Sequence, residues 1–290
     1  MDLERTFLLL VTCSLDETRR DLAVSVTKNI AGLARSIALA GRFVLFDNAS
    51  KFTDHLAHAP AGALFCAANR NIGYWTAIKW VLENRENLRL ADCEYLYIIE
   101  SDLWHYDLSG LSLCERFLDR TPHAVGVRTQ EFSVRWRWRY NKGLRFVPFR
   151  KQRSVVQLIN QVTGEKAQFT KSAVERVYLS NLHTKLPALN RISDLSAAFS
   201  ELSTMEFFSE IDFFKLMRDR KPYVGVLDGG LWYQLSTPQT HNTVSGSWSD
   251  QSTLKSLGYR GTRRASIDRE TFNVQISRIG SDRKPPQDLF

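Results

Sequence analysis

Two carboxylates one residue apart follow an apolar, strand-like run of the chain. Residues 95–99 lead directly into Glu100, Ser101 and Asp102. Residues i and i+2 at a strand end point to the same side, so both carboxylates can face one ion. Charges at the edge of a core need a partner, and Mg²⁺ or Mn²⁺ with phosphate oxygens is a suitable one. The alternative is a strand that simply stops at polar residues.

Two further polar segments follow apolar runs in the same way. Asp47 and Asn48 come directly after residues 43–46. A carboxylate there can accept a hydrogen bond from a nucleobase or a ribose hydroxyl, although an Asx turn explains the pattern as well. Asn71 can cap the helix that follows it, and Gly73 lets a ligand approach the backbone. An exposed helix N-terminus of this kind suits phosphate groups.

An acidic pair lies in a phenylalanine-rich segment that we expect to form an amphipathic helix over residues 207–217. Glu210 stands among four phenylalanines. An apolar surround raises the pKa of a carboxylate toward neutrality, as a general base requires. Asp212 can orient a second substrate or pair with Lys215. A solvated helix face is the alternative for Glu210.

The segment RWRWRY at 135–140 alternates with period two and predicts a hairpin. Its basic side chains would share one face and its aromatic side chains the other. Three functions remain open: binding of an anionic saccharide acceptor, binding of single-stranded nucleic acid, or a plain amphipathic hairpin. If the hairpin binds an anionic saccharide acceptor, the residues that contact it are Arg135, Arg137 and Arg139.

Alternating strands and helices position the first three segments. We expect strands over residues 6–12, 43–46, 64–66, 95–99 and 124–127, with helices over residues 17–40 and 74–84 between them. Short apolar strands separated by helices predict an α/β fold, with a mainly parallel sheet covered on both faces. Ligands in such sheets bind outside the carboxyl ends of the strands. Residues 154–200 look helical and polar.

The order of these segments resembles the family 2 glycosyltransferases, which are inverting enzymes of the GT-A fold. The likeness is greatest to their rhamnosyltransferase-like and polysaccharide-assembly members. It rests on Val11-Thr12, FDNAS at 46–50, NRNIGYWTAI at 69–78 and YIIESD at 97–102. The resemblance implies a Rossmann-like half with a nucleotide-sugar site. It implies nucleotide contacts from Thr12, Asp47, Asn48, Asn71, Gly73 and Ser101, and metal contacts from Glu100 and Asp102.

The resemblance returns at FFSEIDFFKLMRDR, residues 207–220, which is similar to the acidic E-D-x-D-L-x-x-R segment of the family. This match implies that Glu210 is the catalytic base, with Asp212 beside it. His241 is similar to a histidine that adds a metal or diphosphate contact in some members. Glu100 stands where the family has aspartate, and Ser209 replaces an acidic residue. A catalytically inactive sugar-nucleotide-binding relative is therefore an alternative.

Composition narrows the class of protein and its partners. The 290 residues are 43% hydrophobic and carry a formal net charge of +8, which favours acidic partners such as nucleic acid, anionic membrane surfaces or phosphorylated substrates. The four cysteines lack CxxC spacing and predict reduced core thiols rather than disulfides or a zinc site. His55 and His58 lie in a loop-like stretch and are expected at the surface.

These patterns together predict a metal-dependent glycosyltransferase that uses Mg²⁺ or Mn²⁺. It would move a sugar from a nucleoside diphosphate sugar to a saccharide or lipid-linked glycan acceptor, with inversion and without specific nucleic-acid binding. The predicted divisions are a nucleotide-sugar half at 1–104, an acceptor and catalytic half at 105–248, and a basic C-terminal extension at 249–290 that ends in a flexible tail. Apolar runs are too short for a membrane span, so we expect a cytoplasmic protein with at most peripheral contact to the inner membrane face. A nucleic-acid-binding protein that uses the basic hairpin is the main alternative function.

Overall fold

The structure is a computed structural model. It describes residues 3–105, 107–131, 133–134, 169–170, 177–180, 188–202, 207–208, 210–235, 264–265 and 272–280. The helices are α1 (Glu17–Ser36), α2 (Tyr74–Glu83), α3 (Leu111–Arg120), α5 (Ile192–Leu202) and α6 (Glu210–Arg220), with 3-10 turns η1 (Ala40–Arg42) and η2 (Asp54–His58). Two short antiparallel pairs join β7 (Ser133–Val134) to β8 (Phe169–Thr170) and β11 (Phe207–Phe208) to β13 (Arg264–Ala265).

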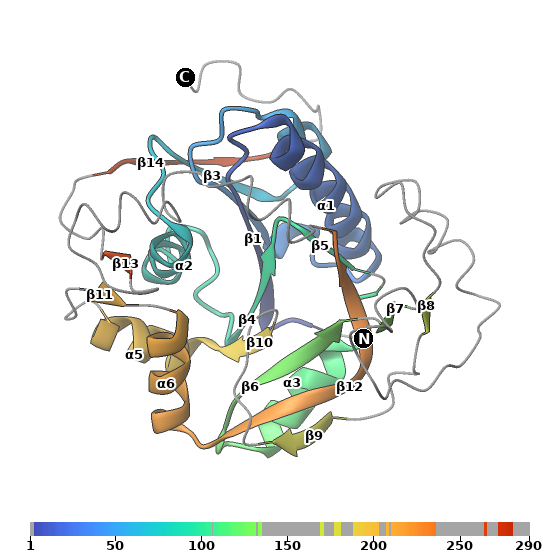
Figure 1. Ribbon diagram of the computed structural model, residues 1–290, viewed down its shortest axis with the longest axis vertical. Helices are drawn as coiled ribbons and strands as arrows, with labels where there is room; N and C mark the ends of the chain where they lie inside the picture. The colour runs from blue at the N-terminus through green and yellow to red at the C-terminus, as the bar shows by residue number, and fades with distance from the viewer. Residues whose placement is uncertain are drawn as a thin grey trace.

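A ten-stranded sheet forms the centre of the described part of the chain (Figure 1). Its order is β14-β3-β2-β1-β4-β10-β6-β12-β5, with β9 paired to β12. The bounds are β1 Thr6–Thr12, β2 Phe43–Asp47, β3 Leu64–Ala68, β4 Tyr95–Glu100, β5 Leu103–His105, β6 Ala124–Glu131, β9 Val177–Ser180, β10 Ala188–Arg191, β12 Tyr223–Gln234 and β14 Val274–Arg278.

Strand direction confirms the α/β fold class. Strands β1, β2, β3, β4, β6 and β12 run the same way, whereas β5, β9, β10 and β14 run the opposite way. The order β3-β2-β1-β4 is that of one half of a Rossmann-type sheet, as the resemblance to GT-A enzymes implied. The antiparallel strands, above all β10 in the middle of the sheet, were not predicted.

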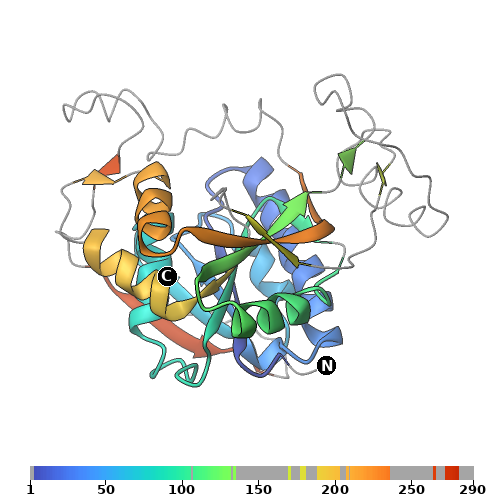
Figure 2. The ribbon, with the colours of Figure 1, turned by 90° about the horizontal axis from the view of Figure 1, so that it is seen from below.

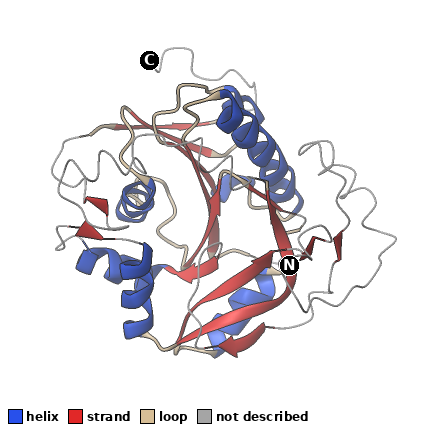
Figure 3. Ribbon diagram, in the orientation of Figure 1, coloured by secondary structure: helices blue, strands red, loops and turns tan. Residues whose placement is uncertain are grey.

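Alternation along β1 sorts the core onto two faces of the sheet. Leu8 and Leu10 pack toward α1 and α3, and Phe7, Leu9 and Val11 pack toward α2, α5 and α6. Figure 3 shows the sheet between α1 on one side and α2, α5 and α6 on the other, and Figure 2 shows the same elements from below. Because both faces are covered, each of these five side chains is almost fully buried.

The predicted helix over residues 17–40 is shorter in the structure, because α1 ends at Ser36. The N–H of Leu39 donates to the carbonyl of Ala34 (2.8 Å), and that of Ala38 to Arg35 (3.3 Å). These bonds define a Schellman motif, with Ala38 in the left-handed region at φ 59°. At the other end, Asp16 caps the helix by accepting the N–H of Arg19 (2.8 Å).

Two further expectations about elements are wrong. The amphipathic helix begins at Glu210 rather than at residue 207, because Phe207 and Phe208 form β11. The stretch 154–200, predicted to be helical, contains β8, β9 and β10 before α5. The period-two hairpin at 135–140 lies outside the described residues.

The described sheet runs through the predicted domain boundaries. The division at residues 104 and 105 falls inside β5, and β10 lies between β4 of the first half and β6 of the second. In the predicted C-terminal extension, β14 pairs with β3 over five positions. Segments far apart in sequence therefore share one hydrogen-bonded sheet.

Candidate functional site

Parallel pairing brings the predicted site residues to one edge of the sheet. Thr12, the last residue of β1, lies beside Asp47, the last residue of β2. On the other side of β1, Val11 is in register with Glu100 at the end of β4. The polar segments after β1, β2 and β4 therefore meet at the carboxyl edge, where ligands bind in open α/β sheets.

Asp47 is fully buried, and its carboxylate makes contacts within the protein. Its Oδ1 lies 3.3 Å from Thr12 Oγ1 and 3.6 Å from Nε2 of His55, and its Oδ2 accepts the N–H of Ser50 (3.4 Å). The Ser50 hydroxyl accepts the N–H of Ser14 (2.8 Å). Asp47 thus ties the loop after β2 to the end of β1, and contact with a base or ribose stays a prediction.

Asn48 and Asn71 connect the loop after β2 to the loop after β3. Asn48 donates from Nδ2 to Asn71 Oδ1 (2.9 Å) and accepts the N–H of Ile72 at its Oδ1 (2.8 Å). Asn71 also donates from Nδ2 to Sγ of Cys13 (3.3 Å), the residue after β1. Burial raises the pKa of the Cys13 thiol to about 11, so this sulfur stays a neutral acceptor. Asn48 is almost fully buried. The pair fixes the geometry of three loops.

The N-cap of α2 is Gly73, not Asn71 as expected. Asn71 instead accepts the N–H of Gly73 at its Oδ1 (2.9 Å), just ahead of the helix. Gly73 has φ 83°, a conformation that glycine adopts without steric cost. No side chain of the described part caps this helix. Its first amides, with the positive end of the helix dipole, therefore suit an anion.

Glu100 is the last residue of β4, and Ser101 and Asp102 form the turn that connects β4 to β5. The carbonyl of Asp102 accepts the N–H of Leu235 (2.8 Å), so the end of β12 lies against this turn. Asp102 is 9% exposed and sits at the boundary of the core. Among the described residues, no group of three or more His, Cys, Asp or Glu side chains is arranged to hold a metal. Any cation here would depend on this carboxylate pair and on oxygens from a ligand.

Aromatic packing places the start of α6 beside the start of α2. The ring of Phe213 lies 4.5 Å from that of Trp75, centroid to centroid, and 5.4 Å from that of Phe199. Phe213 is the fourth residue of α6, and Trp75 is the second residue of α2. The first turn of α6, which contains Glu210 and Asp212, therefore packs through Phe213 against Trp75 in the first turn of α2.

Four of the predicted site residues lie outside the described part of the chain. They are the metal-site candidate His241 and the acceptor-site candidates Arg135, Arg137 and Arg139. Their roles stay predictions.

His55 lies next to the ends of β1 and β2. The expectation that it is at the surface is wrong, because it is fully buried on η2. Its Nε2 lies 3.0 Å from Thr12 Oγ1. Burial follows from contact of η2 with the apolar face of α1, through the half-buried Leu56. A short 3-10 turn has no apolar periodicity to reveal such a position.

A second buried histidine, His105, belongs to a chain of hydrogen bonds among strands β4, β5, β6 and β12. His105 Nδ1 donates to the carbonyl of Leu103 (3.2 Å), so in the neutral ring Nε2 accepts from the hydroxyl of Tyr97 (3.0 Å). Thr129 lies 3.1 Å from the same Tyr97 oxygen and accepts from Nε1 of Trp232 (3.2 Å). Desolvation lowers the pKa of His105 to about 3 and raises the pKa of Tyr97. The chain of bonds is neutral and connects β12, β6, β4 and β5.

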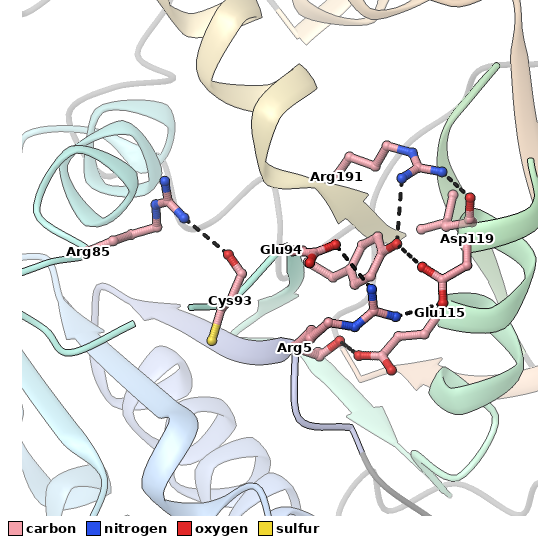
Figure 4. A network of polar contacts seen from close by, with 10 residues as sticks. Arg5, Arg85, Cys93, Glu94, Glu115, Asp119 and Arg191 are labelled. Atoms are coloured by element: carbon pink, nitrogen blue, oxygen red, sulfur yellow. Dashed lines mark hydrogen bonds and ion pairs between the residues drawn. The ribbon is translucent and has the colours of Figure 1, made fainter. Parts of the chain in front are cut away.

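The opposite, amino edge carries a charged network (Figure 4). Arg5 contacts Asp119 (2.6 Å) and Glu94 (3.2 Å), and its guanidinium lies 5.4 Å from the centre of the Tyr95 ring. Tyr95 donates to the other oxygen of Asp119 (2.7 Å). The hydrogen bond from Arg5 lowers the pKa of Asp119. This cluster lies at the ends of β1 and β4 away from the candidate site, so we assign it to stability.

The carboxyl-edge arrangement defines a class: an α/β protein in which polar residues gather at the carboxyl ends of parallel strands. Neither a protein-family model nor a curated protein matches the chain. Among solved structures, the chain is similar to S. aureus TarS 1–349, with 13% identity over 83% of this chain and 63% of that chain, at a TM-score of 0.44. The complex of TarS 1–349 with UDP gives the same values.

A second similar structure is mannose-1-phosphate geranyltransferase from Thermus thermophilus. It is 11% identical over 79% of this chain and 75% of that chain, at a TM-score of 0.34. This chain spans less than two thirds of TarS 1–349. At these identities and TM-scores, none of these likenesses establishes an activity.

None of the described helices is both long and apolar enough to cross a membrane.

Proposed function

We propose that this protein is a glycosyltransferase that moves a sugar from a nucleoside diphosphate sugar to a saccharide or lipid-linked glycan acceptor. One observation carries the proposal. The strand register brings the Asp47 loop, the Glu100–Asp102 turn and the uncapped start of α2 to a single edge. Such an edge combines hydrogen-bond acceptors for a nucleoside with donors and carboxylates suited to a diphosphate.

The donor nucleotide would lie across the ends of β1, β2 and β3. Its base or ribose would meet the loop held by Asp47, beside Thr12. Its diphosphate would approach Gly73 and the first amides of α2, next to the loop that the Asn48–Asn71 pair holds in place. The absence of a side chain at Gly73 gives a phosphate access to the backbone. Ser101 would contribute from the neighbouring turn.

Glu100 and Asp102 would hold a divalent cation, Mg²⁺ or Mn²⁺. Their chemistry fits, because such cations prefer hard oxygen ligands and are often bound by one or two carboxylates plus substrate phosphates. His241 is the further candidate ligand. It follows Leu235 by six residues, and Leu235 donates its N–H to the Asp102 carbonyl. When bound, the cation would neutralise charge on the leaving diphosphate.

Glu210 would act as the general base that takes the proton from the acceptor hydroxyl, and direct attack would invert the anomeric centre. Support comes from the Phe213–Trp75 packing, which puts the first turn of α6 near the first turn of α2. Asp212 would orient the acceptor. Arg135, Arg137 and Arg139 would bind an anionic acceptor on the same side.

Donor binding is tested with purified protein and UDP, GDP or dTDP, each with Mn²⁺, Mg²⁺ or EDTA. We expect one nucleotide to raise Tm in a metal-dependent way and to give a measurable Kd by calorimetry. Asp102→Asn should weaken that binding at least about tenfold, because a neutral amide is a poorer ligand for a hard cation. Glu86→Gln, which changes an exposed carboxylate away from this edge, is the control. Equal affinity in the Asp102 variant would remove the metal assignment.

The base is tested by separating binding from turnover. Glu210→Gln should leave nucleotide affinity nearly unchanged and reduce turnover by about a hundredfold or more. Asp219→Asn changes an exposed carboxylate on the same helix and should keep the parent rate. Turnover near the parent value in the Glu210 variant would move the base to Asp212.

The two alternatives are separated by the same experiments. The basic hairpin on which nucleic-acid binding rests lies outside the described residues, so that function stays a prediction from sequence. Salt-sensitive binding of single-stranded oligonucleotides, without any nucleotide diphosphate response, would favour it. Nucleotide binding without turnover of any UDP-, GDP- or dTDP-sugar would favour an inactive relative.

A further inference from the structure

His55 lies below the carboxyl edge, between the ends of two strands. The side chain is fully buried, with Nε2 3.0 Å from Thr12 Oγ1 and 3.6 Å from Asp47 Oδ1. Thr12 Oγ1 is in turn 3.3 Å from Asp47 Oδ1 and 3.3 Å from the carbonyl oxygen of Phe46. His55, Thr12 and Asp47 therefore form one contiguous buried polar cluster, the edge triad.

The partners of the ring determine which nitrogen carries the proton. Nδ1 is buried and has no hydrogen-bond partner among the described residues. A buried N–H without an acceptor costs the full desolvation of that group, whereas an unused acceptor nitrogen costs less. A ring that carries hydrogen on Nε2 is thus favoured over one that carries it on Nδ1 alone, and His55 donates to Thr12 Oγ1.

This donor directs the hydroxyl proton of Thr12. A threonine hydroxyl donates once and accepts on its lone pairs. With His55 filling an acceptor position, the Thr12 proton is left to the two nearby oxygens, Asp47 Oδ1 and Phe46 O. The first of these bonds fixes one carboxylate oxygen of Asp47, while the N–H of Ser50 holds the other.

We infer that His55 is a positioning residue of the donor-nucleotide site. It acts through the Thr12 hydroxyl to hold the Asp47 loop in the conformation that binds the nucleoside, without touching the donor itself. The inference rests on the proposed function and adds a residue to it. A loop already ordered before binding loses less conformational entropy, so its effect belongs to nucleotide affinity and KM rather than to kcat.

Substitutions that keep or remove the N–H distinguish positioning from packing. In His55→Gln the side-chain amide nitrogen can occupy the place of Nε2 and donate to Thr12, so nucleotide affinity should stay within about threefold of the parent. His55→Leu fills the space with an apolar side chain but supplies no donor. It should raise both the nucleotide Kd and the donor KM by about tenfold, the effect of one net hydrogen bond. Turnover at saturating donor should change less than about twofold.

The route through Thr12 is tested by a double-mutant cycle. Thr12→Val removes the hydroxyl and should lose about tenfold in nucleotide affinity, whereas Thr12→Ser keeps the hydroxyl and should lose less than Thr12→Val. If His55 acts through Thr12, His55→Leu with Thr12→Val should lose no more than either alone. The control is His58→Leu on the same 3-10 turn, which should leave Kd unchanged.

Kd for UDP, GDP and dTDP with Mn²⁺ is measured by calorimetry well below the Tm of each variant, and Tm is recorded without nucleotide. Supporting results are rescue by Gln and non-additivity with Thr12→Val. If the parent binds a nucleotide and His55→Leu binds it equally, or if losses follow only the fall in Tm, the role of His55 is refuted while the proposed function stands. If the parent binds none of the three, both fail together.

Discussion

At the scale of single residues, burial and partners decide the chemistry of each titratable group. His105 and Glu115 are both almost fully buried, yet burial shifts the pKa of the first downward and that of the second upward. His105 sits in a neutral chain of hydrogen bonds that has no place for an added proton. Glu115 accepts a hydrogen bond from Thr6, but desolvation, the larger effect, raises the pKa of its carboxyl. Neither property can be read from the residue type alone.

His105 makes stability depend on pH in a defined direction. Its folded pKa is lowered from 6.5 to about 3, so between these values the unfolded chain binds a proton that the folded protein excludes. The free energy of unfolding therefore falls as the pH falls from about 6.5 toward 3. We expect this histidine to contribute a loss of about 2 kcal/mol between about pH 7.5 and about pH 5.

Urea denaturation of the parent and of His105→Gln at both pH values measures this contribution. The variant should be less stable at the higher pH but should lose less on acidification. His123→Gln, a change of the same residue type on the exposed surface, is the control. An unchanged difference between the two pH values in His105→Gln would contradict the assignment.

At the scale of elements, backbone geometry decides how closely strands and helices approach. In β6, a Cβ on Gly126 would lie 2.7 Å from the carbonyl oxygen of Leu189 in β10 and 3.0 Å from Asn190 Oδ1. The nearer atom, the Leu189 carbonyl oxygen, belongs to the backbone of the neighbouring strand, which cannot yield like a flexible side chain. The close approach of β10 to β6 thus depends on glycine at position 126. Because Gly126 has no Cβ, the antiparallel strand β10 fits in the middle of the sheet.

Gly126→Ala should therefore destabilise the protein by about 1–3 kcal/mol, as expected for overpacking. Gly32 in α1 is the matched control, because a Cβ there meets no atom within 4 Å. Gly32→Ala should instead raise stability by about 0.5–1 kcal/mol through helix propensity. Urea midpoints of both variants measure the two effects, and a neutral Gly126→Ala would show that β10 can shift.

Ala38 gives a second prediction about an element, the C-terminus of α1. Its φ of 59° lies in the left-handed region, which is unfavourable for a residue with a Cβ. Ala38→Gly should raise the free energy of unfolding by about 1 kcal/mol. Ser25→Gly, in the middle of the same helix, should lower it by a similar amount. Thermal denaturation distinguishes the opposite signs, and a loss in both variants would contradict the cap assignment.

At the scale of the whole molecule, a strand near the C-terminus, β14, adds to the edge of the sheet that the N-terminal strands form. β14 pairs antiparallel with β3, and flanking bonds join Asn69 N–H to the Asn273 carbonyl (3.0 Å) and Ile279 N–H to the Ala63 carbonyl (2.9 Å). Residues 273 and 279 thus turn their backbone polar groups toward β3. The backbone N–H and C=O groups of successive residues point to opposite sides of a strand. Those of Ser277 therefore point toward β3, and those of Ile276 point away from it.

A pair of proline substitutions tests this arrangement. Ser277→Pro removes an N–H that pairs with β3, whereas Ile276→Pro removes one that points to the open edge. We expect Ser277→Pro to cost at least about 1 kcal/mol more than Ile276→Pro in urea denaturation. Equal costs would mean that β14 contributes little to the stability of the sheet.

The parallel half of the fold was predictable because its signals are local. Five strands were expected near their observed positions, and β1 over residues 6–12 agrees at both ends. The apolar runs are continuous, since both faces of this part of the sheet are covered. Ligand contacts were expected outside the carboxyl ends of these strands, and the register places Thr12, Asp47 and Glu100, which end β1, β2 and β4, at one edge.

The rest depended on contacts between distant segments. β10 and β14 are short, and nothing in their own sequences indicates that they pair with β4 and β3. His55 is buried because η2 packs on α1, and the packing of Phe213 on Trp75 decides where α6 begins relative to the edge. Sequence by itself determined which residues end the parallel strands. Only the tertiary structure decided their neighbours, because burial and pairing are made between segments and not within them.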